Sequence, residues 1–177
     1  MKLASPVMDV LIRPMRIEDL EQVQAIDDQS FSMPWPASAY RYELTENQNS
    51  LVWVAEINPS TGDRQVVGIM VVWLILDEAH IATLAVHPDY RRQSIARRML
   101  VNALKAVIRR GFHLATLEVR SGNLPAQNLY RDFKFEVVGR RYRYYRDNSE
   151  DALIMTANNL NDRYLEWLEN QSGHPSA

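Results

Sequence analysis

The sequence predicts an α/β protein built on one mixed, mostly antiparallel sheet with a central parallel strand pair and helices on both faces. Short connections join apolar segments of strand length, which is typical of antiparallel hairpins. A helix-length segment separates the strands expected at 79–86 and 114–120. Two strands joined in this way are parallel, and the connection between them is right-handed. Helical periodicity recurs along the chain, so helices are available for both faces of the sheet.

The N-terminal half alternates between segments of strand and helix character. Leu20, Val23 and Ile26 share one helical face, and two prolines make residues 31–36 irregular. Pro36 suits the first turn of a helix. The expected elements are, in order, a strand at 10–15, a helix from 20, a helix from 36 to about 47, a strand at 51–57, a turn at 58–63 and strands at 66–76 and 79–86.

The C-terminal half opens with a strongly amphipathic helix. An apolar stripe runs along it from Ile95 to Val107, and Gly111 follows its last turn, as is common at helix ends. The remaining expected elements are a strand at 114–120, a short helix at 124–133, a hairpin of strands at 135–145 and 151–157, and a C-terminal helix at about 159–170.

Length and composition indicate one folded domain. The chain has 177 residues, 46% of them hydrophobic and 24% charged, with a net charge of −2. We expect a single domain over 1–177 with its core at about 10–157 and a disordered tail at 171–177. The charge favours neither nucleic acid nor a membrane surface, and without a long apolar segment we expect a cytoplasmic protein. No oligomeric state is predicted.

The absence of cysteine excludes disulfides, thiolate metal ligands and a cysteinyl intermediate. The four histidines, 80, 87, 113 and 174, show no metal-ligand spacing, so no metal is expected.

A candidate anion site follows the strand that ends at Val86. The segment 87–94 carries Arg91 and Arg92 and leads directly into the helix that begins near Ile95. A helix N-terminus presents unpaired N–H groups and the positive end of the helix dipole, and both favour phosphate. We therefore expect a phosphorylated cofactor at the C-terminal end of this strand.

Two further positions are candidates for chemistry, and each has a structural alternative. Glu118 lies on the opposite side of its strand from Ala115, Leu117 and Val119, so it is either a reactive carboxylate or a partner in a salt bridge. Tyr130 shares a helical face with Asn123 and Gln127, and it either packs in the core or takes part in the reaction. Asn123 is also a good N-cap for the short helix.

The order of these elements and several motifs resemble the GNAT N-acetyltransferases over about residues 10–157. The cofactor signature of that family is similar to 91–96, Arg-Arg-Gln-Ser-Ile-Ala. Within the family the chain resembles the ribosomal-protein-alanine N-acetyltransferases (RimI-type). The resembling stretches are 31–35, 76–79, 84–86, 117–120, Asn123, 129–130, 144–145 and 150–152.

The resemblance implies acetyl-CoA as acetyl donor and a role for each matching residue. Glu118 is implied as general base and Tyr130 as general acid toward the departing thiolate. Cofactor contacts are implied for Leu84, Ala85, Val86, Arg91, Arg92, Gln93, Ser94, Ile95, Ala96, Arg97, Asn123 and Tyr130. Ser94 and Lys134 stand where the family usually has glycine. At a left-handed position each would cost about 1–2 kcal/mol.

The acetyl acceptor is expected to lie against two aromatic segments. These are the loop with Phe31, Pro34 and Trp35 and the hairpin with Tyr142, Tyr144 and Tyr145, which either bind substrate or pack a small lid. The RimI-type resemblance implies a protein N-terminus, specifically an alanine of a small-subunit ribosomal protein. Two alternatives stay open: a small amine or internal lysine as acceptor, and a non-catalytic acyl-CoA-binding module.

Overall fold

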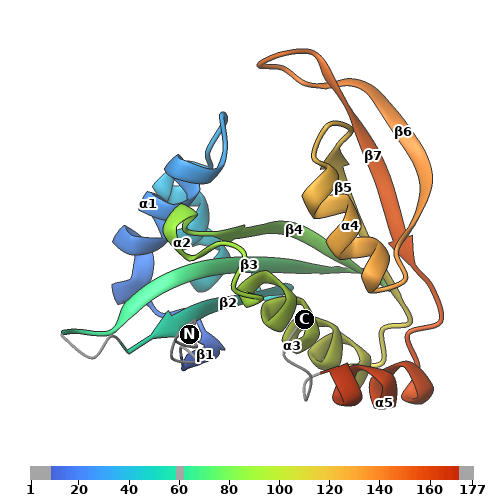
Figure 1. The fold of residues 1–177 in the computed structure, drawn as a ribbon, viewed down its shortest axis with the longest axis horizontal. Helices are drawn as coiled ribbons and strands as arrows, with labels where there is room; N and C mark the ends of the chain where they lie inside the picture. Colours follow the sequence, from blue (N-terminus) through green and yellow to red (C-terminus); the bar gives the residue numbers. More distant parts are fainter. Residues whose placement is uncertain (1–8, 59–61, 172–177) are drawn as a thin grey trace, which may run out of the picture.

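The computed structural model describes residues 9–58 and 62–171, and within them seven strands form one sheet in the order β1-β2-β3-β4-β5-β7-β6 (Figure 1). Neighbouring strands are antiparallel except β4 and β5, which are parallel as predicted. The strands are β1 (Val10–Pro14), β2 (Ser50–Ile57), β3 (Gln65–Ile75), β4 (Glu78–Val86), β5 (Leu114–Arg120), β6 (Glu136–Tyr145) and β7 (Glu150–Ala157).

The helices occur in the predicted order, but several begin or end at residues other than those expected. Pro36 caps α2, which ends at Thr45, two residues before the expected end. Helix α5 includes Gln171, so the tail expected from residue 171 begins at residue 172 at the earliest. Residues 172–177 of that tail lie outside the described residues, as do residues 59–61 of the predicted turn. The helices are α1 (Leu20–Ser30), α2 (Ala37–Thr45), α3 (Ile95–Arg109), α4 (Leu124–Asp132) and α5 (Asp162–Gln171), with short 3-10 turns η1 (Ile17–Asp19) and η2 (Pro88–Tyr90).

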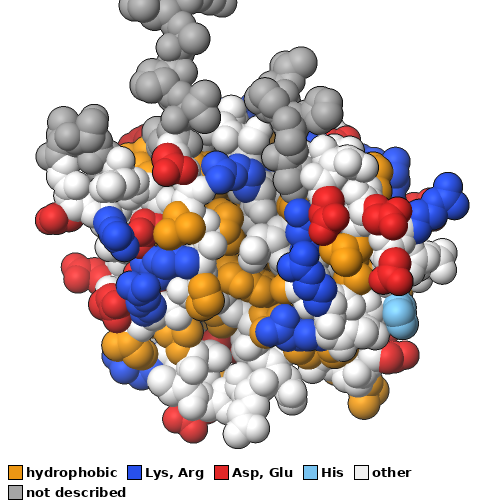
Figure 2. Space-filling model, turned by 90° about the horizontal axis from the view of Figure 1, so that it is seen from below, with side chains coloured by type: hydrophobic (Ala, Val, Ile, Leu, Met, Phe, Trp, Pro, Cys, Tyr) orange, Lys and Arg blue, Asp and Glu red, His pale blue; other side chains and the backbone are white. Residues whose placement is uncertain are grey.

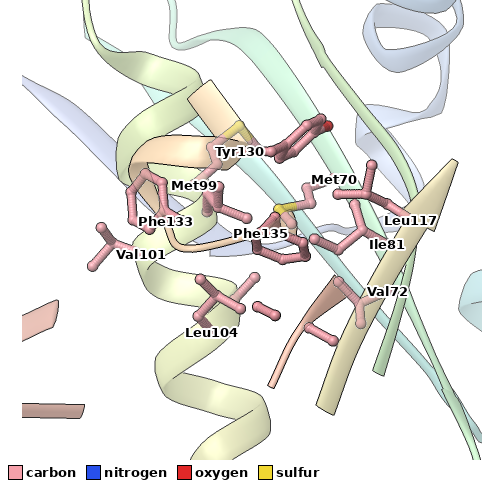
Figure 3. Packing of buried hydrophobic residues seen from close by; sticks show 14 of the residues in the cluster. Met70, Val72, Ile81, Met99, Val101, Leu104, Leu117, Tyr130, Phe133 and Phe135 are labelled. Atoms are coloured by element: carbon pink, nitrogen blue, oxygen red, sulfur yellow. The ribbon is translucent and has the colours of Figure 1, made fainter. Parts of the chain in front are cut away.

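Two hydrophobic layers cover the sheet, one on each face. Helix α3 packs on one face together with side chains of α4 and α5, and Figure 3 shows Met99 and Leu104 of α3 against strand residues such as Met70. Helices α1 and α2 cover the other face. The approach of α3 is close, because a Cβ on Gly68 of β3 would lie 2.8 Å from the Sδ of Met99.

A β-bulge at Ala82 interrupts β4. Ala82 has no partner in β3 between the paired residues Ile81 and Thr83. Such an extra residue shifts the alternation of side chains by one position. Leu84 therefore packs in the same hydrophobic layer as Ile81, although it follows Ile81 by an odd number of positions, three.

Beyond the bulge β4 and β5 diverge. Their pairing ends at Ile81 and Leu117, whereas β4 stays paired with β3 as far as Val86 and β5 with β7 as far as Arg120. The edge of β4 that faces this gap carries backbone groups that β5 does not bind. The gap divides the sheet at the C-terminal ends of its two parallel strands, the usual place for a ligand in an α/β sheet.

On the face drawn in Figure 2, basic side chains border a hydrophobic area, and acidic side chains lie around them. Within the residues described, no helix combines the length and apolarity needed to cross a bilayer.

The end of α4 is a Schellman motif built without glycine. The N–H of Lys134 donates to the carbonyl of Arg131 (2.9 Å), and the N–H of Phe135 donates to the carbonyl of Tyr130 (3.1 Å). The rings of Phe135 and Tyr130 are 5.8 Å apart, which supplies the hydrophobic contact of the motif. Lys134 adopts a left-handed conformation with φ of 63°, so the position that the family pattern reserves for glycine does require left-handed backbone.

We expect Lys134→Gly to raise the free energy of unfolding by about 1 kcal/mol, because glycine lacks the Cβ that disfavours this conformation. Lys134→Ala is the control, since it removes the same side chain and keeps the Cβ. Urea unfolding of both variants checks this. Equal stability of the glycine and alanine variants would show that the backbone at this position is not strained.

Candidate functional site

A pocket of about 720 Å³ lies where the end of β4, the start of α3 and helix α4 meet. Its volume is that of an ordinary small-molecule site. Its lining residues are Leu84, Val86, Tyr90, Arg91, Arg92, Ser94, Ile95, Ala96, Arg97, Leu124, Pro125, Ala126, Asn128, Leu129, Tyr130 and Asp132. Nine of them are cofactor contacts expected from the sequence.

The loop before α3 is shaped by two left-handed residues, Arg92 (φ 62°) and Ser94 (φ 59°). Ser94 therefore adopts the conformation that glycine favours, and the serine carries the cost of its Cβ. The first α3 bond runs from the N–H of Arg98 to the carbonyl of Ser94 (3.0 Å), so the N–H groups of Ile95, Ala96 and Arg97 lie outside the helical ladder. These donors at the pocket fit a pyrophosphate.

The arginines of this loop differ in what they contact. Arg91 donates from Nε to the carbonyl of Val86 (2.9 Å), which ties the loop to the end of β4. Arg97 forms an ion pair with Asp132 of α4. The side chain of Arg92 lines the pocket and has no hydrogen bond or ion pair within the described part of the chain. Arg92 is thus the guanidinium most available to an anion.

Three expected cofactor contacts do not line the pocket. The side chain of Ala85 packs in the hydrophobic layer of α1 and α2, on the other face of the sheet. Gln93 reaches the carbonyl of Asp89 at 3.5 Å. Asn123 caps α4, since its Oδ1 accepts from the N–H of Ala126 (3.2 Å), as its sequence context predicted.

Glu118 lies on the face of the sheet opposite the pocket. In β5, Ala115, Leu117 and Val119 are buried and Glu118 is half-buried, in agreement with the predicted alternation. Its Oε2 lies 3.2 Å from Nε2 of His80, and its Oε1 accepts from Nε of Arg141 (3.1 Å). These contacts, with the His80 hydrogen bond first, hold the pKa of the Glu118 carboxyl below its usual value. The carboxylate is therefore ionised at neutral pH.

Tyr130 lies on the side of the sheet that α3 covers, and it lines the pocket. Its ring is buried beside Phe135, and Figure 3 shows it at the edge of the cluster with the hydroxyl directed away from Phe133. Burial raises the pKa of Tyr130 well above its usual value, so the hydroxyl is protonated at neutral pH. The side chain both packs and borders the pocket, so the two interpretations of the sequence apply together.

Tyr145 connects the two sides of the gap. It is close enough to Glu118 and to Tyr130 to interact electrostatically with both. The guanidinium of Arg120 lies 3.8 Å from the centre of the Tyr145 ring, and burial raises the pKa of this tyrosine to about 12. The other hairpin tyrosines are more exposed, Tyr142 at 79% and Tyr144 at 48%.

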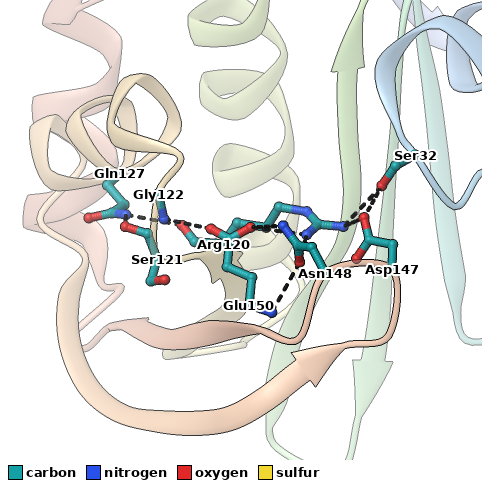
Figure 4. Close-up of polar contacts among 8 residues, drawn as sticks. All are labelled: Ser32, Arg120, Ser121, Gly122, Gln127, Asp147, Asn148 and Glu150. Carbon is teal, nitrogen blue, oxygen red and sulfur yellow. Dashed lines mark hydrogen bonds and ion pairs between the residues drawn. The ribbon is translucent and has the colours of Figure 1, made fainter.

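Arg120 also joins the tip of the hairpin to the loop after α1 (Figure 4). It donates to Glu150 (3.0 Å), to Asp147 (2.9 Å) and to the hydroxyl of Ser32 (3.1 Å). Ser32 and Asp147 are hydrogen-bonded directly as well. One guanidinium thus fixes both aromatic segments that the sequence assigned to the acceptor.

A buried carboxylate, that of Asp27, holds the loop after α1 in place. Asp27 accepts from the N–H of Trp35 and from the hydroxyl of Tyr40, each at 2.6 Å. The indole of Trp35 stacks on that of Trp73 at 5.8 Å, while Phe31 is 38% exposed and Pro34 lies at the surface. Trp35 therefore packs, and Phe31 and Pro34 remain at the surface.

The sequence reasoning missed the two partners of Glu118. His80 was considered only as a metal ligand, and Arg141 not at all. The parallel register pairs His80 with Thr116, and Glu118 follows two residues later on the same side of β5. Only this register, which the sequence does not fix, brings His80 to Glu118. Among the residues described, no group of histidine and carboxylate side chains could hold a metal ion.

Comparisons with known proteins agree with this geometry. The model of the acetyltransferase (GNAT) family matches residues 20–135. A Bacillus subtilis (strain 168) protein, named provisionally as a ribosomal protein bS18-alanine N-acetyltransferase, is 37% identical over 81% of this chain and 92% of its own length. The Escherichia coli (strain K12) ribosomal protein bS18-alanine N-acetyltransferase is 29% identical over 81% of this chain and 94% of its own.

Two solved structures are similar in the same way. The crystal structure of the ribosomal-protein-S18-alanine N-acetyltransferase from Escherichia coli has a TM-score of 0.74 at 27% identity and covers 85% of this chain and 94% of its own. That of the NatC complex bound to Gag peptide and CoA has a TM-score of 0.77 at 25% identity, over 85% of this chain and 99% of the other.

We expect Arg92→Ala to weaken the binding of coenzyme A by about tenfold or more, because it removes a charge-assisted contact to phosphate. Arg110→Ala, the same change of charge at the far end of α3, is the matched control and should bind as the wild type does. Calorimetric titration with coenzyme A checks both variants. Equal affinities for all three proteins would exclude Arg92 from the anion site.

Proposed function

We propose, from the premise that this chain belongs to the acetyltransferase (GNAT) family and is an acetyl-CoA-dependent N-acetyltransferase, that it acetylates the N-terminal α-amino group of proteins. The candidate substrate is the N-terminal alanine of ribosomal protein bS18, the substrate in the names of its relatives. The observation that carries the proposal is the two-sided gap between β4 and β5. A pocket with anion-binding features lies on one side, and a carboxylate among aromatic side chains lies on the other.

Acetyl-CoA supplies the activated acetyl thioester when bound. The N–H groups at the start of α3 and the side chain of Arg92 are suited to its pyrophosphate, and Leu84 and Val86 to its pantetheine arm. The unpaired edge of β4 beyond Ile81 can add backbone hydrogen bonds to that arm, as an additional strand would.

The charges near Glu118 favour a peptide over a polyamine. A site for a polycation needs carboxylates free of protein cations. Here four carboxylates are already paired with arginines: Glu118 with Arg141, Asp147 and Glu150 with Arg120, and Asp151 with Arg140. Exposed aromatic side chains remain on both segments, Tyr142 and Tyr144 on the hairpin and Phe31 on the loop after α1, and they suit an extended chain with one amino group.

Glu118 acts as the base in this proposal. An α-amino group has a pKa of about 8, so most of it is protonated at neutral pH and cannot attack a thioester. The usual carboxyl pKa is about 4.3, and complete transfer of the proton to such a group costs about 5 kcal/mol. Because an ammonium nitrogen has no free electron pair, the proton has to leave before the attack, and the nearby negative charge of Glu118 favours its loss.

Tyr130 acts toward the leaving thiolate. Its hydroxyl stays protonated because burial raises its pKa. A thiol of pKa about 8.5 is a stronger acid than such a phenol, so Tyr130 stabilises the developing thiolate chiefly as a hydrogen-bond donor. The Schellman motif of α4 fixes the backbone of Tyr130, and the contact with Phe135 holds its ring before substrate binds.

Acetylation of a peptide panel tests the proposal. We expect thiol release from acetyl-CoA with peptides that begin with free alanine or serine, and none with a blocked N-terminus followed by lysine. Glu118→Gln should lower the rate by about 100-fold or more and leave acetyl-CoA affinity unchanged. Release with spermidine or with the blocked lysine peptide, and none with free N-termini, would contradict the proposal.

A further inference from the structure

A stack of aromatic rings leads from the loop after α1 to Glu118. The imidazole of His80 lies on the indole of Trp73, with ring centres 5.7 Å apart and planes at 18°. Trp73 in turn stacks on Trp35. Its indole N–H donates to Oε2 of the buried Glu43 in α2 (3.0 Å), which fixes the indole. The plane of the His80 ring is therefore set by packing.

The position of His80 in this stack directs Nε2 at the Glu118 carboxylate. The distance to Oε2 is 3.2 Å, and Arg141 occupies Oε1, so each carboxylate oxygen has one partner. Of the two, Arg141 is half exposed on the edge strand β6, whereas His80 is held between β3 and β5. His80 is thus the more rigid of the two supports.

We propose, building on the proposed function, that His80 is a positioning residue for Glu118 and that a positive charge on its imidazole weakens Glu118 as a base. A neutral imidazole with its proton on Nε2 donates one hydrogen bond and leaves the carboxylate free to accept a proton. A protonated imidazole adds a full positive charge and makes the carboxylate a weaker base.

The reaction step balances with Glu118 as acceptor. An N–H bond of the substrate ammonium breaks, its proton passes to a carboxylate oxygen of Glu118, and the electron pair stays on nitrogen for the attack on the thioester. His80 neither gains nor loses a proton in this step.

The sign of the pH effect follows from the two ionisations. The pKa of the Glu118 carboxyl lies below its usual value, so this group stays ionised at every pH at which an ordinary carboxyl is ionised. Histidine is the side chain whose charge ordinarily changes between about pH 5 and 8. The α-amino group of the substrate, with a pKa of about 8, also contributes to a fall of kcat in that range, so the contribution of His80 is the part that its replacement by glutamine removes. The charged and titratable groups around it are Glu78 on β4, Glu118 and Arg120 on β5, Glu43 behind Trp73, and Arg141 and Tyr145 on β6.

The test is kcat against pH with saturating acetyl-CoA and an alanine peptide, because kcat then reports ionisations in the bound complex. His80→Gln retains an N–H donor and cannot titrate. We expect it to lower kcat a few-fold at pH 8 and to move the midpoint of the acidic limb down by more than one pH unit. His80→Phe, which keeps the stacking and loses the donor, should lower kcat more, about tenfold, with KM for acetyl-CoA unchanged in both. His113→Gln, far from Glu118, should leave the profile as in the wild type.

Imidazole NMR of wild type and Glu118→Gln provides a second measurement that does not depend on variants of His80. Loss of the carboxylate partner should lower the titration midpoint of one histidine. An acidic limb unchanged in His80→Gln, or no histidine affected by Glu118→Gln, would overturn the inference. If the wild type acetylates no peptide N-terminus, the proposed function fails instead, and the two failures are thereby distinct.

Discussion

In the described sheet, β4 and β5 are joined by four residue pairs, the last of them Ile81 and Leu117, and everything proposed for this protein follows from the separation beyond them. In a continuous sheet, a substrate bound on one face could not reach a group on the other face. Because the strands part, the pocket beside α3 and the carboxylate side chain of Glu118 open onto the same gap. The bulge at Ala82 turns Leu84 toward the pocket at this point. The topology thus lets two substrates approach from opposite faces and meet.

The elements around the gap position the reacting groups before either substrate arrives. The Schellman motif at the end of α4 fixes Tyr130, and the Trp73–His80 stack together with Arg141 fixes Glu118. Arg120 holds the hairpin tip against the loop after α1. Such preorganisation lowers the cost of orienting groups during the reaction. It also accounts for the left-handed conformations of Ser94 and Lys134, whose strain other contacts of the fold offset.

Much of this arrangement could be predicted from the sequence, and the rest depends on register. Periodicity predicted the helices and strands, the crossover predicted the parallel pair, and the alternation in β5 predicted which way Glu118 faces. The contact of His80 with Glu118 could not be predicted, because one residue of register shift would turn either side chain to the other face. The same holds for Ala85, which packs away from the pocket because of the bulge. That Trp35 packs on Trp73 depends on the loop path set by the buried Asp27.

The central claim is that acetyl donor and amine meet in the gap and react directly. Initial velocities measured while acetyl-CoA and an alanine peptide are both varied test it. The account predicts intersecting reciprocal plots, and an unchanged protein mass after incubation with acetyl-CoA alone. Parallel plots, together with an acetylated protein that passes its acetyl group to the peptide, would contradict it, because they require a covalent intermediate on the enzyme.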